Sequence, residues 1–583
     1  MRPESSGGGA GGATAALETS QSKYLSASGG EQEMHVVLTV RVEGTVPTHP
    51  THPTDPTHPT HPADPTGHPG RGPHGDDRRG PDAGDRRAPD GDAVRHPDGD
   101  AIRHAAGAGP GGAPLLAQVL VVDCSGSMTW PQEKFRAARQ AAAAAIRMLP
   151  AGTRFAVVQG TEDATMVFPA HEGMAVSSAG QRRRAEAALQ GLPAGGGTCI
   201  GAWLDLAGRL LAAQDAPIGH VLLLTDGRNE HDRTMPLDAV LDTWEGRFVC
   251  DAWGIGDGWD AGELLRVARR LHGSVGAVRE EAALPGEYEK LTARLLTKTV
   301  PELTVEVTPA PGTAIRYLKQ VFPTEADLEP GGPPGPDGAY RYTTRAWGDE
   351  TRRYHLCLTA DPTGRPRGED LQLAAVGLAR PAAGPAMAPT AVRLPPPRAC
   401  VVHWTEDPAL SRHTDTQVAH FQLYGRFGQA VAAAAAAYRR GDREAAERHL
   451  GEGVRLAHAV GATRPLADFR RLADIEDAAA GRLRLRPDLA PIDFEHLITA
   501  SSHSTYGPEP DDPAPPPGLP PHPPGGAGTD PATGPDPGPG TAFSATAPAP
   551  APALTRPCPA CDGRAPLTAR FCPRCGHDLR ERP

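Results

Sequence analysis

The sequence predicts an α/β fold: a doubly wound domain with a mostly parallel sheet, followed by a β-sandwich, a helical region and a small cysteine module. Between residues 113 and 300, short apolar runs alternate with amphipathic helical patterns, as in a parallel sheet covered on both faces by helices. Residues 301–405 show only short strand patterns between Pro and Gly, which is typical of a β-sandwich. Two Cys-x-x-Cys pairs lie near the end of the sequence.

Composition limits how much of the chain can fold and what it can bind. The 583 residues include 68 Gly and 64 Pro, and aromatic residues make up only 5%, so part of the chain is predicted to lack a packed core. With 59 basic and 70 acidic residues the formal net charge is -11, whereas a mainly nucleic-acid-binding protein usually has a basic face. Nucleic acid is therefore an unlikely partner.

Apolar stretches, the first residues and the cysteines together predict a cytoplasmic protein without a membrane anchor. No apolar stretch approaches the roughly 20 residues that a membrane span needs. The first residues, MRPESSGGGAGG, do not resemble a signal peptide. Five further cysteines are scattered along the chain, which fits a reducing compartment.

The part before the α/β domain divides into three segments. Residues 1–32 are rich in Gly, Ala and Ser, and we expect them to be disordered. Residues 33–45 contain a β-branched strand pattern, which we assign to the β-sandwich, so that the α/β domain is inserted within the β domain. Residues 46–112 form a low-complexity insert of Pro, His, Asp and Gly. Its eight histidines permit weak metal binding, but an extended linker is the simpler interpretation.

Apolar patterning predicts each element of the α/β domain, 113–300. We expect strands at 115–123, 154–160, 164–170, 220–227 and 248–255. Helices are predicted at 131–148, 181–192, 200–214, 236–246, 260–272 and 285–299. Pro131 suits the first turn of the first helix.

After the β-sandwich at 301–405, residues 415–482 are predicted to be helical, with helices at 443–459 and 465–480. Residues 501–556 form a second Pro- and Gly-rich linker. A run of hydroxyl residues lies where the helices give way to this linker, and we expect it to be exposed, either as an ordinary solvated linker or as a site of phosphorylation-regulated docking. Its candidate acceptors are Thr499, Ser501, Ser502, Ser504 and Thr505.

Oxygen-bearing side chains are predicted to gather at the carboxyl edge of the parallel sheet. One strand runs into Asp123-Cys124-Ser125-Gly126-Ser127, a Gly-rich loop ends in Thr198 before a helix, and another strand ends in Thr225-Asp226-Gly227. Ligands bind at this edge of doubly wound sheets. Five side chains there suit Mg²⁺, which takes oxygen ligands and keeps several waters: Asp123, Ser125, Ser127, Thr198 and Asp226.

The pattern VLVVDCSGSM…GGGT…LLLTDG resembles the von Willebrand factor A (VWA) domain and its metal-ion-dependent adhesion site (MIDAS). The resemblance covers about 115–300 and implies a Rossmann-like fold. It also implies that Asp123, Ser125, Ser127, Thr198 and Asp226 hold Mg²⁺, or Mn²⁺ or Ca²⁺, and that the ion accepts a carboxylate from a partner protein. Cys124 occupies a variable position, where we expect a buried thiol.

The last segment, 557–583, is predicted to be a structural zinc ribbon. Cys558 and Cys561 form one Cys-x-x-Cys pair, and Cys572 and Cys575 form the other. Four thiolates at this spacing suit a closed tetrahedral Zn²⁺ site. So short a module needs the metal to fold. Its arginines permit either protein docking or nucleic-acid contact, and we favour protein docking because Phe571 is the only aromatic residue beside them.

The whole layout resembles bacterial proteins that combine a VWA domain with a sandwich, helices and a zinc ribbon. That resemblance implies roles in protein assembly or signalling beside kinases or forkhead-associated domains. No GxSxG, Walker A or HExxH pattern is present, so we expect no enzyme. The leading hypothesis is a binding or scaffold protein; the alternatives are a subunit of a chelatase-like ATPase machine and a metal-dependent hydrolase.

Overall fold

The computed structural model describes residues 12–45, 115–233, 235–380, 392–504, 555–557 and 564–566. The predicted insert at 46–112 lies outside these residues, as do Thr505 and most of the linker predicted at 501–556. Among the described helices, none combines the length and the apolar character needed to cross a membrane.

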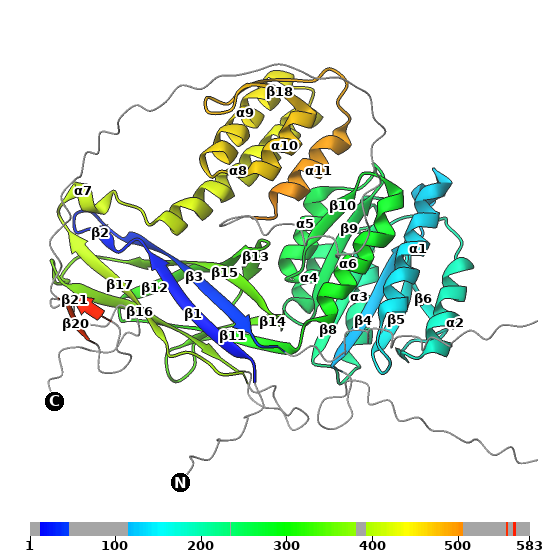
Figure 1. Ribbon diagram of the computed structural model, residues 1–583, viewed down its shortest axis with the longest axis horizontal. Coiled ribbons are helices and arrows are strands. Elements are labelled where there is room, and N and C mark those ends of the chain that lie inside the picture. Colours follow the sequence, from blue (N-terminus) through cyan, green and yellow to red (C-terminus); the bar gives the residue numbers. More distant parts are fainter. Residues whose placement is uncertain are drawn as a thin grey trace, which may run out of the picture.

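The α/β domain is built on a sheet in the order β10-β9-β8-β4-β5-β6, with β7 also pairing with β5 (Figure 1). The strands from β10 to β5 run parallel, whereas β6 and β7 are antiparallel to β5. All eight residues of the central strand β4 are buried. The strands are β4 (Leu116–Asp123), β5 (Arg154–Gly160), β6 (Ala164–Phe168), β7 (Ala175–Val176), β8 (Ile218–Thr225), β9 (Val249–Ile255) and β10 (Val275–Val278).

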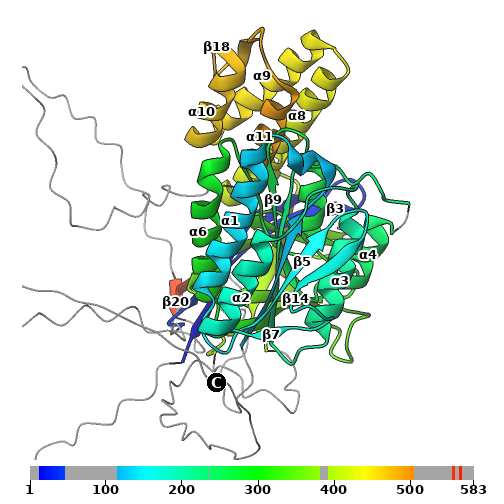
Figure 2. The same ribbon diagram turned by 90° about the vertical axis from the view of Figure 1, so that its right-hand side faces the viewer.

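Helices cover both faces of this sheet, as Figure 2 shows from the side. Side chains alternate along β4, so Val119 and Val121 pack on one helical layer while Leu120 and Val122 pack on the other. The first layer comprises α3 (Ile200–Ala212), α4 (Leu237–Trp244) and α5 (Ala261–Arg270). The second comprises α1 (Gln132–Met148), α2 (Ala179–Gln190) and α6 (Leu284–Leu296). Two 3₁₀ turns, η1 (Gly126–Thr129) and η2 (Glu281–Ala283), precede α1 and α6.

Two further sheets have five strands each, in the orders β1-β3-β15-β12-β13 and β14-β11-β16-β17-β2, and their strands come from both sides of the α/β domain in sequence. They share one apolar core, to which Leu38, Val305 and Trp404 contribute. Within it, β3 pairs with β15 over eleven residues of each strand, although the whole α/β domain separates them in sequence. The strands are β1 (Thr14–Gln21), β2 (Tyr24–Ser26), β3 (Gln32–Glu43), β11 (Val300–Pro309), β12 (Thr313–Phe322), β13 (Ala326–Leu328), β14 (Tyr340–Trp347), β15 (Glu350–Ala360), β16 (Asp370–Ala379) and β17 (Arg398–Thr405).

The expectation that residues 1–32 are disordered is wrong for residues 14–26. Strand β1 pairs antiparallel with β3 from Thr14 to Gln21, and β2 pairs parallel with β17. Ala15 and Leu17 are buried in the shared core. The segment is polar because only every second residue of β1 faces the core, and its partner strands supply most of the buried surface.

The helical region begins with α7 (Pro408–Ser411), α8 (Thr416–Arg439) and α9 (Arg443–Ala459). The helix predicted at 465–480 is wrong in its second half, because α10 (Thr463–Leu472) ends and a hairpin of β18 (Ala473–Asp477) and β19 (Arg482–Leu485) follows. The chain then enters α11 (Pro491–Ser501). Near the carboxyl terminus, β20 (Thr555–Pro557) and β21 (Arg564–Pro566) form an antiparallel hairpin.

The helical region packs against the α/β domain rather than standing apart from it (Figure 1). Phe494 and Leu497 of α11 belong to the same apolar core as Leu264 of α5. The backbone amide of Ala261 at the start of α5 donates to Glu495 at 2.9 Å, and Arg439 pairs with the same carboxylate at 3.0 Å. Helix α11 therefore attaches the helical region to the α/β domain at α5.

This docking contradicts the prediction of an exposed hydroxyl run. Thr499, Ser501, Ser502 and Ser504 are all buried, and Thr505 lies outside the described residues. The Thr499 hydroxyl donates to the Glu495 carbonyl, and the Ser504 hydroxyl donates to the Val321 carbonyl of β12. A kinase therefore cannot reach these four hydroxyls while α11 stays docked.

Glycines make room for tryptophans in the layer beside the site edge. A Cβ on Gly160, at the end of β5, would lie 2.4 Å from the Trp203 ring. We expect Gly160→Ala to lower the free energy of unfolding by about 1–3 kcal/mol, because the ring is fully buried and cannot move aside. Urea denaturation of the full chain measures this change.

Gly425→Ala in the interior of α8 is the matched control, since nothing lies within 4 Å of its added Cβ. It should instead stabilise the protein by about 0.5–1 kcal/mol through helix propensity. An unchanged urea midpoint for Gly160→Ala would contradict the packing described here.

Candidate metal site and interdomain cavity

Asp123 ends β4 and is completely buried. One of its carboxylate oxygens accepts from the backbone amide of Ser125 at 2.8 Å. The other accepts from the Thr225 hydroxyl at 2.6 Å and from the Asp226 amide at 3.3 Å. The ends of β4 and β8 are thus joined through this one carboxylate.

Asp226 is the second fully buried carboxylate of the site. Its Oδ1 accepts from the Ser127 hydroxyl at 2.6 Å, and the Ser125 and Ser127 hydroxyls lie 2.9 Å apart. Its Oδ2 forms an ion pair with Lys134 of α1, whose side chain is only 4% exposed. The ammonium group thus partly neutralises the two carboxylates.

Thr198 reaches the same place from the Gly-rich loop. A Cβ on Gly227 would lie 3.0 Å from the Thr198 hydroxyl and 3.6 Å from the Ser127 hydroxyl, so both groups border this glycine. The loop is held by backbone bonds from Gly126 to Gly196 and from Gly195 to Cys124. The structure therefore brings all five predicted metal-binding residues together.

The electrostatics of the site favour a bound cation. Burial, and next the neighbouring Asp226, raise the pKa of Asp123 to about 6. The donors are three hydroxyls and two carboxylates, a set of hard oxygen ligands. Two buried carboxylates share one ammonium group, so a divalent cation would relieve their repulsion. The residues present fit such an ion.

Cys124 is buried between these ligands and faces the helical layer of α1. Burial raises the pKa of its thiol to about 12, so it stays protonated and unreactive. All five cysteines among the described residues are free thiols and buried.

Three neighbours of the site were not predicted. Lys134 interrupts the apolar face of an Ala-rich helix, and that interruption was a usable signal. Glu162 accepts from the Gly197 amide at 2.7 Å, and this bond lowers the pKa of Glu162. Trp130 lies three residues after Ser127 and is 79% exposed. No sequence pattern distinguished these last two from ordinary loop residues.

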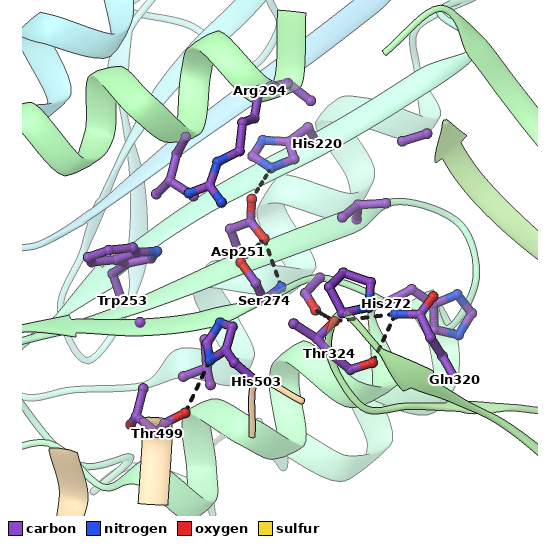
Figure 3. Close-up of a pocket in the computed structure, with 18 of the residues that line it drawn as sticks. His220, Asp251, Trp253, His272, Ser274, Arg294, Gln320, Thr324, Thr499 and His503 are labelled. Carbon is purple, nitrogen blue, oxygen red and sulfur yellow. Dashed lines mark hydrogen bonds and ion pairs between the residues drawn. The ribbon is translucent and has the colours of Figure 1, made fainter. Parts of the chain in front are cut away.

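A cavity of about 540 Å³ lies away from the metal-binding residues (Figure 3). Three parts of the chain meet there: the α/β domain, helix α11 and the sheet to which β12 belongs. None of the five predicted metal-binding residues lines it. The side chains of Arg294, Trp253 and His503 converge on it from α6, β9 and the end of α11 (Figure 3). Nothing in the sequence pattern indicated this cavity, because its walls come from segments distant in sequence.

Asp251 of β9 organises one wall of the cavity (Figure 3). His220 Nε2 lies 3.0 Å from its Oδ2, and both the amide and the hydroxyl of Ser274 donate to its Oδ1 at 2.7 Å. Burial alone would raise the pKa of Asp251. The hydrogen bonds and the charge of His220 outweigh burial and hold this pKa at about 2.

The predicted zinc ligands Cys558, Cys561, Cys572 and Cys575 lie outside the described residues. Another group of potential ligands, Glu33, His35 and Cys357, lies on the first five-stranded sheet.

Comparisons with known proteins agree with this domain and its fold. Residues 117–276 match the family model of the von Willebrand factor type A domain. The solved structure of a von Willebrand factor type A protein from Catenulispora acidiphila is 28% identical, with a TM-score of 0.66, over 85% of this chain and 98% of that chain. The α/β part of the chain is thus a VWA domain, and the structural match extends beyond it.

Two other matches are more limited. The uncharacterized protein sll0103 of Synechocystis sp. is 28% identical over 219 residues, which are 36% of this chain and 49% of that protein. The chain therefore spans about half the length of this curated relative. Proximal thread matrix protein 1 from the mussel byssus, solved with a zinc-occupied MIDAS motif, is 21% identical over 32% of this chain and 46% of that chain, with a TM-score of 0.27.

The lowered pKa of Asp251 makes a testable contribution to stability. A depressed pKa stabilises the fold above the unfolded value near 3.8, and this stabilisation is lost as the pH falls through about 2. We expect Asp251→Asn to lower the free energy of unfolding by about 2 kcal/mol at pH 7. The difference from wild type should shrink between pH 4 and pH 2, as measured by urea denaturation at several pH values. A difference that stays constant over that range would show that the charge of Asp251 is not responsible.

Proposed function

We propose that the chain is a non-enzymatic protein-binding or scaffold protein whose VWA domain holds Mg²⁺ and captures an acidic residue of a partner. The observation that carries this proposal is the pair of fully buried carboxylates, Asp123 and Asp226, with three hydroxyls beside them. In the part of the chain that the structure describes, the one ion pair to these carboxylates comes from Lys134. Ser125, Ser127 and Thr198 would supply neutral oxygens to the ion, and the carboxylates would bind it directly or through water. When bound, the ion supplies an electrophilic centre for a carboxylate oxygen.

The residues around the site support binding to another protein. Trp130 offers an exposed aromatic ring beside the metal ligands, and such rings are enriched in protein interfaces. The hydroxyls of Ser125 and Ser127 hydrogen-bond each other, and Ser127 also donates to Asp226, an arrangement that suits holding a cation. The exposed ring beside them favours capture of a partner.

The cellular setting of this proposal follows from the layout of the chain. We infer a cytoplasmic protein, because the five described cysteines are unpaired. Its partners would be proteins that present a carboxylate, in signalling assemblies with kinases or forkhead-associated domains. The four terminal cysteines would hold Zn²⁺ in a ribbon that docks other proteins. Neither a membrane nor nucleic acid is part of the proposal.

Asp123→Ala should abolish both Mg²⁺ binding and partner capture while the protein stays folded. Asp123 sits in a polar site, so its loss removes a ligand but little apolar packing. Calorimetric titration with MgCl₂ measures the first effect. The second is measured by immobilising the full chain, exposing it to cell extract, and comparing by mass spectrometry the proteins retained with Mg²⁺ and released by EDTA.

Asp215→Ala is the matched control, because Asp215 is an exposed carboxylate that precedes β8 at the opposite edge of the sheet. Trp130→Ala should keep Mg²⁺ binding but weaken capture, which separates the ion from the protein contact. Retention of the same proteins by wild type and Asp123→Ala would contradict the proposed role. A Mg²⁺-dependent partner that is an ATPase would instead support the chelatase-like alternative.

A further inference from the structure

Three potential metal ligands converge on the first five-stranded sheet, a different sheet from the one that carries the VWA site. Glu33 and His35 are two residues apart on β3, so both point to the same face. Cys357 of β15 lies directly opposite His35 in the strand register. The intervening residues, such as Met34 and Leu356, fill the core, so the three ligands lie on the outer face of this sheet.

Their donor atoms lie close to the spacing of a zinc site, and small side-chain movements would complete it. Glu33 Oε2 lies 3.5 Å from His35 Nε2 and 3.9 Å from Cys357 Sγ, and all three atoms lie within 4.8 Å of one another. Zinc bonds of about 2.0–2.3 Å in a tetrahedron place neighbouring ligand atoms roughly 3.3–3.8 Å apart. We propose that Glu33, His35 and Cys357 form a zinc site with one open coordination position.

The remaining atoms of these side chains are held in a manner that suits this assignment. Glu33 Oε1 pairs with Arg316, which leaves Oε2 directed at His35 and Cys357. His35 Nδ1 lies 3.1 Å from Nε2 of His355. When His35 Nε2 binds a metal, its proton is on Nδ1, which then donates to His355. A hydrogen bond of this kind fixes the tautomer and the ring orientation of a metal-binding histidine.

The chemistry of the three donors selects the ion. A thiolate with an imidazole and a carboxylate suits Zn²⁺, whereas Mg²⁺ avoids sulfur. Binding breaks the Cys357 S–H bond, releases its proton to water and forms a Zn–S bond. Three protein ligands leave a fourth position for water.

The site would also act on the fold. Glu33 and Cys357 are 324 residues apart in the sequence, on either side of the VWA domain. Zinc would therefore cross-link the amino-terminal strand to β15 and hold the two ends of the interrupted β domain together. The three ligands differ from those proposed for Mg²⁺ and from the cysteines of the predicted ribbon.

The test compares zinc content in full-length variants. Metal-free wild type, Glu33→Gln, His35→Gln and Cys357→Ser are each loaded with ZnCl₂, freed of excess by gel filtration and analysed for zinc. Glu18→Gln is the matched control, because Glu18 is an exposed glutamate on the adjacent strand β1. Wild type and Glu18→Gln should hold one zinc more per chain than His35→Gln, whatever the ribbon binds. Zinc affinity should fall at least about tenfold in Glu33→Gln.

Cobalt supplies a second readout that reports on the thiolate itself. The sulfur-to-cobalt charge-transfer absorption should lose the same amplitude in Cys357→Ser and in His35→Gln, and none in Glu18→Gln. If Cys357→Ser does not fold, Glu33→Gln decides, because that side chain is 41% exposed and its change leaves the core intact. Equal zinc content and equal affinity in wild type, Glu33→Gln and His35→Gln would overturn the site.

Discussion

Two carboxylates buried at one edge of a parallel sheet are the constraint on which the rest of this site depends. Asp123 and Asp226 are both inaccessible to solvent, and burial of unpaired charges costs several kcal/mol each. Backbone amides and the Thr225 and Ser127 hydroxyls donate hydrogen bonds to these carboxylates, and Lys134 forms an ion pair with Asp226. A single ammonium group leaves net negative charge in place, so the edge is suited to a cation.

The surrounding architecture holds this edge rigid. Strand β4 is buried along its whole length between two helical layers, so its end cannot move without disturbing both. Helix α11 joins the core of the helical region to α5, and in the neighbouring sheet β15 returns to pair with β3. A partner captured at the metal edge would thus bind a rigid platform that is packed against the helical region.

Much of the site could be predicted from the sequence because its geometry follows from strand direction. The carboxyl ends of parallel strands meet at one edge, so Asp123 and Asp226 were expected there, and the pairing of β4 with β8 makes them neighbours. Lys134 lies on helix α1 and not at a strand end. Its contact with Asp226 depends on where α1 packs on the sheet, and the apolar periodicity of the helix does not predict that position.

The sequence predictions that were wrong share one cause, which is tertiary packing. Strand β1 has few apolar residues, and it forms because β3 offers it a partner edge. The helix predicted to continue beyond Leu472 gives way to the β18–β19 hairpin. Thr499 and Ser502 are polar yet buried, because α11 docks in a junction of three parts of the chain. The Glu33, His35 and Cys357 cluster was equally invisible, since its register depends on pairing across the inserted domain.

Anomalous diffraction from crystals of the full chain grown with Mn²⁺ would locate the cation that the two buried carboxylates are proposed to bind. The proposed site predicts one strong peak at the carboxyl edge of β4, roughly 2.0–2.3 Å from the Ser125 and Ser127 hydroxyls, with Thr198 and the two aspartates directly or through water in its coordination shell. A map without a peak there, in which Lys134 alone faces Asp226 at saturating Mn²⁺, would contradict a metal-dependent binding site.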